Sequence, residues 1–123
     1  MTITKKDFTE ALQAIVKQYG TSYVYQTEQG ILFTESGEES CFYQVNGQPS
    51  CLIGHVFDRL GLEYDPEWEG LSAYDIMLSY DVEESLADAA AEAQATQDLG
   101  GTWGQALVTY EQTLRQHKEQ ANA

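Results

Sequence analysis

Basic residues are scarce in this sequence. Six Lys and Arg residues stand against twenty Asp and Glu residues, which gives a net charge of −14. The stretch from Gln18 to Leu114 holds seventeen acidic residues and one basic residue, Arg59, a net charge of −16. Proteins that bind nucleic acid or anionic lipid directly neutralise phosphates with Lys and Arg. We therefore expect no direct nucleic-acid binding and no membrane binding, and a protein partner with a basic surface.

Long apolar stretches are missing as well. No run approaches the ~20 apolar residues that cross a bilayer, and the opening residues MTITKKDFTEAL lack the apolar core of a signal peptide. We therefore expect a cytoplasmic protein. A length of 123 residues with 42% hydrophobic residues indicates one domain, 1–123, that buries a core without a metal or disulfide. The polar end of the chain, about 116–123, is expected to be a flexible tail.

Apolar residues at helical spacing predict most of the secondary structure. The first helix has a capping box at Thr4 and Asp7 and stops at Gly20. A second helix, 51–60, follows a cap at Ser50. A short helix in 71–80, an alanine-rich helix opened by Asp81 and a last helix capped by Thr102 complete the set.

Three short β-type runs lie between the first two helices, at 22–26, 31–33 and 41–45. Asn46-Gly47, a strong tight-turn signal, closes the third run. Together these patterns predict an α+β fold, in which a small antiparallel three-strand sheet packs with about four to five helices.

Cys51 and His55 are four residues apart on the second predicted helix, so their side chains are neighbours on one face. A thiol at a helix N-terminus beside a histidine is a candidate nucleophile. Cys41, Cys51 and His55, with His117 as a fourth ligand, are an alternative zinc set of weak spacing. A Cys41–Cys51 disulfide is disfavoured in a reducing cytosol. The favoured interpretation is two packed thiols and no cofactor.

The segment EYDPEWE, residues 63–69, combines acidic and aromatic residues. Its first acids match the spacing of a calcium loop, but Ile76 stands where a bidentate Glu is needed. As an exposed loop it suits protein contact, with aromatic anchors and carboxylates that meet Arg or Lys. The alternatives are an acidic surface that only solubilises the protein and a tryptophan folded onto the core. The predicted partner-binding residues are Glu63, Tyr64, Asp65, Glu67, Trp68, Glu69, Asp75, Asp81, Glu83 and Glu84.

Two segments, PSCLIGHVFDRLGL and QATQDLGGTWGQALVTY, resemble small uncharacterised proteins of actinobacterial phages and prophages. The resemblance covers about half of the chain and names no reaction. It implies a small accessory protein that acts inside a bacterial cell. With the charge, it suggests a non-enzymatic protein that inhibits or modulates a nucleic-acid-handling or defence protein of the host, by nucleic-acid mimicry. The alternatives are a Cys51–His55 enzyme or zinc protein, and a homodimer built on the alanine-rich helix.

Overall fold

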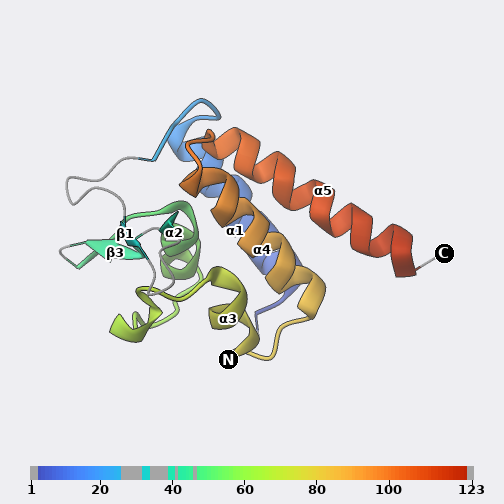
Figure 1. The fold of residues 1–123 in the computed structure, drawn as a ribbon, viewed down its shortest axis with the longest axis horizontal. Coiled ribbons are helices and arrows are strands. Elements are labelled where there is room, and N and C mark those ends of the chain that lie inside the picture. Colours follow the sequence, from blue (N-terminus) through green and yellow to red (C-terminus); the bar gives the residue numbers. More distant parts are fainter. Residues whose placement is uncertain (1–2, 26–31, 34–38, 41, 46, 122–123) are drawn as a thin grey trace.

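The computed structural model describes residues 3–25, 32–33, 39–40, 42–45 and 47–121. Five α-helices dominate this described part of the chain (Figure 1). α4 and α5 lie side by side, and α1 packs against α2 and α5. The helices and the short 3-10 helix η1 are α1 Lys5–Tyr19, α2 Leu52–Arg59, η1 Pro66–Trp68, α3 Ala73–Leu78, α4 Glu84–Asp98 and α5 Trp103–Ala121.

Local hydrogen bonds explain where several of the predicted helices begin. Thr4 Oγ1 accepts a hydrogen bond from the Asp7 amide at 3.1 Å, as predicted for α1. At α5, Thr102 and Gln105 cap each other reciprocally, with hydrogen bonds of 2.8 and 3.0 Å. The predicted cap of α2 is wrong by one residue. Cys51, not Ser50, occupies the cap position, and its sulfur accepts a hydrogen bond from the Gly54 amide at 3.4 Å.

The start of α4 also differs from the prediction. The helix begins at Glu84 after Glu83, whose side chain makes no capping hydrogen bond. Asp81 lies before this cap, in a left-handed backbone conformation with φ +57°. Asp adopts this conformation more readily than most residues because its short side chain bonds locally. Asp81 therefore belongs to the turn between α3 and α4 and does not begin α4.

The predicted α+β class fits broadly, but the described residues do not form the predicted three-strand sheet. The described strands form two separate antiparallel pairs of two residues each. The run at 22–26 does not join either pair among the described residues, because Val24 bridges Thr102 and the Tyr23 carbonyl accepts from the Trp103 amide at 2.8 Å. The extended chain thus binds the start of α5. The pairs are β1 Leu32–Phe33 with β2 Glu39–Ser40, and β3 Gln44–Val45 with β4 Gln48–Pro49.

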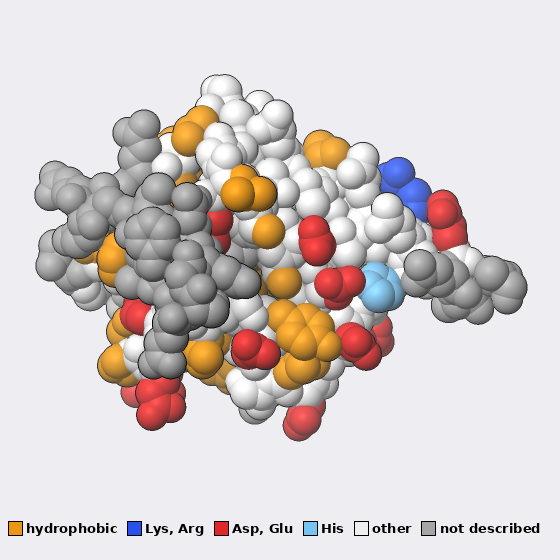
Figure 2. Space-filling model, in the orientation of Figure 1, with side chains coloured by type: hydrophobic (Ala, Val, Ile, Leu, Met, Phe, Trp, Pro, Cys, Tyr) orange, Lys and Arg blue, Asp and Glu red, His pale blue; other side chains and the backbone are white. Residues whose placement is uncertain are grey.

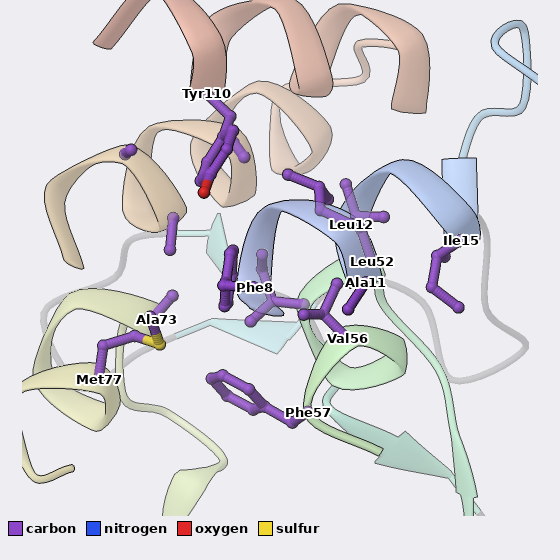
Figure 3. Close-up of a cluster of buried hydrophobic side chains, with 14 of the residues drawn as sticks. Phe8, Ala11, Leu12, Ile15, Leu52, Val56, Phe57, Ala73, Met77 and Tyr110 are labelled. Atoms are coloured by element: carbon purple, nitrogen blue, oxygen red, sulfur yellow. The ribbon is translucent and has the colours of Figure 1, made fainter. Parts of the chain in front are cut away.

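One cluster of buried side chains runs through all five helices. Phe8 of α1, Val56 and Phe57 of α2 and Met77 of α3 lie close to one another in its centre, and Tyr110 of α5 covers it (Figure 3). Each large apolar side chain that is fully buried stabilises the fold by about 1.5–3 kcal/mol. Four alanines of α4 are completely buried in the same cluster, so that face of the helix is not open to a second copy: Ala87, Ala89, Ala90 and Ala93.

The predicted tail begins inside a helix, because α5 continues to Ala121. Near this end, Thr113 is buried and His117 is half-buried against α4. The flexibility of residues 116–123 stays a prediction. Within the described residues, no helix combines the length and the apolar character that a bilayer crossing requires.

Candidate acidic interaction surface

Two buried glutamines of α4 hydrogen-bond to distant parts of the chain. Gln97 Oε1 accepts a hydrogen bond from the Leu52 amide at 2.9 Å, at the start of α2, and so joins the two segments that carry the resemblance. Gln94 Oε1 accepts from the Ala73 amide at 2.7 Å, at the start of α3, while its Nε2 donates to the Tyr43 hydroxyl at 2.6 Å. Because these amides are buried, they need an acceptor from the protein. The glutamines of the QATQD segment therefore have an architectural role.

Two glycines of the same segments allow close backbone approach. A Cβ on Gly54 would stand 2.9 Å from the Tyr43 carbonyl carbon, and a Cβ on Gly104 would stand 2.6 Å from the Thr21 carbonyl oxygen. Real side chains do not reach these distances without moving the backbone. Gly54 thus lets α2 pack closely against the backbone of Tyr43, just before β3. Gly104 lets α5 pack closely against the loop after α1.

Cys51 is completely buried, and its sulfur lies at the cap of α2. The helical wheel places Cys51 on the side away from the apolar stripe, but the Phe42 carbonyl accepts from its amide at 3.0 Å and covers that side. His55 packs against the rings of Tyr19 and Trp103, with centroids 5.0 and 5.7 Å away. Burial lowers the pKa of His55 from 6.5, and Asp58 opposes this effect.

The residues weighed for zinc are not brought together within the described chain. No group of three or more His, Cys, Asp or Glu side chains among the described residues could hold a metal ion. His117 Nε2 lies 2.7 Å from Asp88 Oδ2, so this histidine pairs with α4. Cys41 lies outside the described residues, and a site that includes it stays a prediction.

The loop at 63–69 divides into an inward and an outward set of side chains. Trp68 is only 6% exposed and packs against Phe57, with ring centroids 5.1 Å apart. Glu69 is half-buried and accepts from the amides of Tyr43 and Gln44 and from the Tyr64 hydroxyl. The prediction that Trp68 anchors a partner is therefore wrong, because the core already holds this ring.

Tyr64 belongs to the same internal network as Glu69. The Tyr64 hydroxyl donates to Glu69 Oε2 at 2.6 Å. Burial, this hydrogen bond and the charges of Glu69 and Asp65 raise the pKa of Tyr64 to about 12. Tyr64 and Glu69 thus fix the shape of the loop, although both remain partly accessible.

Seven of the predicted partner-binding residues are exposed carboxylates, which we call the acidic surface. Within the described chain, none of them lies within 4.0 Å of a Lys or Arg nitrogen. Lys5 lines the same shallow pocket as Asp81 and Glu83 without an ion pair. Figure 2 shows acidic side chains over α3 and α4, with Lys and Arg visible near the outer part of α5. The acidic surface consists of Glu63, Asp65, Glu67, Asp75, Asp81, Glu83 and Glu84.

Two half-buried tyrosines, one within α3 and one just after it, lie near parts of the acidic surface. The Tyr74 hydroxyl donates to Glu84 Oε1 at 3.2 Å. Burial and the charges of Glu84, Asp88 and Asp75 raise the pKa of Tyr74. Burial and the charges of Asp65 and Glu63 raise the pKa of Tyr80. Tyr74 is therefore associated with acids of α4, and Tyr80 with acids of the loop at 63–69.

Sequence reasoning did not single out Tyr74, Tyr80 or Asp88. The repeated tyrosine in YDIMLSY, next to exposed acids, was the available signal for the two rings. No local pattern pointed to Asp88, because its partner His117 lies twenty-nine residues later on α5.

One groove among the described residues is lined by uncharged side chains. It has a volume of about 690 Å³ and lies between the loop after α1, the end of α4 and the start of α5. In this groove the Thr96 hydroxyl donates a hydrogen bond to the Thr109 hydroxyl at 3.0 Å. The acidic surface does not overlap these lining residues.

Comparison of the chain with models of known protein families gives no match. Neither the curated proteins nor the solved structures give one. The function is therefore argued from this chain's own geometry and charge.

Proposed function

We propose that this protein is a non-enzymatic binding protein whose acidic surface binds a basic surface on another protein. The observation that carries the proposal is the set of seven exposed carboxylates that have no Lys or Arg ion-pair partner in the described chain. Their charge is therefore not cancelled by an ion pair with any described residue. A surface of one sign attracts an oppositely charged partner over several ångströms and raises the association rate.

The kind of partner follows from this charge and from the resemblance to phage proteins. A groove that binds nucleic acid presents Lys and Arg at positions that match phosphates. Carboxylates on a rigid protein can occupy such positions. We propose that the target is a nucleic-acid-handling or defence protein of a bacterial host, which this protein inhibits or modulates by occupying its basic groove.

Affinity capture from bacterial host lysate tests the proposal. The tagged wild-type protein is compared with the variant Glu63→Lys/Glu67→Lys at low and high salt. The matched control is Glu10→Lys/Glu119→Lys, which has the same net charge but changes exposed residues of α1 and α5. We expect wild type and control to capture the same protein at low salt and to lose it at high salt, and the loop variant to lose it at both.

A nucleic-acid competitor then tests the mimicry. Added DNA should release the captured protein if both ligands occupy one basic groove. Capture that resists DNA and salt, and that survives the loop substitutions, would contradict the proposed function.

A further inference from the structure

The solvent face of α3 carries apolar side chains as well as acids. Leu71 precedes the helix and Leu78 ends it, and each is 40% exposed. Tyr74 and Leu78 are four residues apart on the helix and so are neighbours on one face, and both are more exposed than the buried Ile76 and Met77. Hydrophobic side chains next to acidic ones are visible over α3 and the start of α4 in Figure 2.

Acids lie beside this apolar face. Glu84 at the start of α4 accepts a hydrogen bond from Tyr74 at 3.2 Å, and Asp75 of α3 is exposed. The face therefore combines an apolar strip with negative charge next to it.

We infer that this face is a docking surface for a basic amphipathic helix of the partner protein. The inference rests on the proposed function and specifies the segment that the acidic surface recognises. An amphipathic helix places its apolar residues on one stripe and can place Lys and Arg along both edges of it. Such a helix complements the strip formed by Leu71, Tyr74 and Leu78 in both charge and hydrophobicity.

Charge alone does not account for the composition of this face. A purely electrostatic contact gains nothing from leucines, and most of its affinity is lost as salt rises. Apolar burial adds a contribution that salt does not screen, roughly in proportion to the area that is covered. The docking helix is therefore recognised by its apolar stripe and not only by its net charge.

Two synthetic peptides of leucine and lysine test the inference. The first has all its leucines on one face when helical, and the second has the same composition with the leucines scattered around the helix. Binding of each to the wild-type protein is measured by isothermal titration calorimetry at low and moderate salt. We expect the amphipathic peptide to bind about tenfold or more tightly than the scattered one.

Two double variants locate the site. Leu71→Ser/Leu78→Ser removes the apolar strip, and Leu99→Ser/Val108→Ser removes two exposed apolar residues elsewhere. The first variant should lose the preference for the amphipathic peptide, and the second should keep it. Circular dichroism confirms that both variants are folded.

The remaining outcomes separate this inference from the proposed function. Equal, salt-sensitive binding of both peptides, unaffected by Leu71→Ser/Leu78→Ser, would overturn the docking face and leave electrostatic binding intact. Equal losses in the two double variants would also overturn it. If neither peptide bound at low salt, the proposed function would fail together with the inference.

Discussion

Replacement of Gln97 by Ala should destabilise the protein through one buried amide. Gln97 is 3% exposed, and its Oε1 is the acceptor for the Leu52 amide, 2.9 Å away at the start of α2. Ala cannot supply this acceptor. Leu52 is completely buried, and its amide then loses its hydrogen bond without reaching water.

The magnitude follows from two costs. An unsatisfied buried amide costs about 1–3 kcal/mol, and the space left by a truncated buried side chain adds about 1 kcal/mol. The free energy of unfolding should therefore fall by about 3 kcal/mol, a large part of the ~5–15 kcal/mol of an ordinary domain. With a urea dependence of about 1–3 kcal/mol per molar, the midpoint falls by about 1–3 M.

Urea unfolding followed by far-ultraviolet circular dichroism measures this midpoint. Gln112→Ala is the matched control, because it makes the same substitution at an exposed position of α5. We expect Gln112→Ala to change the midpoint very little. If Gln97→Ala changed it no more than this control does, the hydrogen bond from Leu52 to Gln97 would not stabilise the start of α2, and the architectural role of the QATQD segment would be refuted.

Three further substitutions test the site description. Gly54→Ala forces a Cβ against the Tyr43 carbonyl and should lower the melting temperature by about 10 °C or more; an unchanged melting temperature would contradict the close approach. Because burial lowers the pKa of His55, the neutral form is favoured in the folded state, so its contribution to stability is complete above pH 6.5 and is lost as pH falls through the folded pKa. His55→Gln should remove this part of the pH dependence below pH 6.5, and a pH profile identical to wild type would refute it. Trp68→Ala should cost about 3–5 kcal/mol, because the ring lies in the core; a small loss in urea unfolding would instead favour a surface role.

Local patterns predicted the helices well because their signals lie within a few residues. The cap at Thr4 bonds three residues ahead, and Thr102 and Gln105 do the same at α5. Gly20 ends α1 as predicted, with φ +95°. Such contacts depend on spacing along the chain, which the sequence displays directly.

Contacts between distant segments were not predictable in the same way. The extended run at 22–26 was expected to join a sheet, but its partner is the start of α5, about eighty residues later. Cys51 was placed away from the core by the helical wheel, yet it is completely buried, and the Phe42 carbonyl in the segment before β3 accepts a hydrogen bond from its amide. A helical wheel describes one helix by itself. It cannot show which other segment packs against the side of that helix that lies away from the apolar stripe.

The acidic surface was predictable in composition but not in detail. The exposed positions of Glu63, Asp65 and Glu67 agree with the prediction. The inward position of Trp68 does not agree with the prediction. The neighbouring sequence looks the same whether an apolar ring in an acidic loop contacts a partner or packs into the core. The structure shows that the core holds this ring.

The most direct measurement of the central claim is the salt dependence of affinity for the captured host protein. Dissociation constants are measured from about 50 to 200 mM salt for wild type, Glu63→Lys/Glu67→Lys and Glu10→Lys/Glu119→Lys. We predict that wild-type binding weakens steeply with salt and that the loop variant binds about tenfold or more weakly than the control variant. An affinity that is independent of salt and equal in the two variants would contradict recognition through the acidic surface.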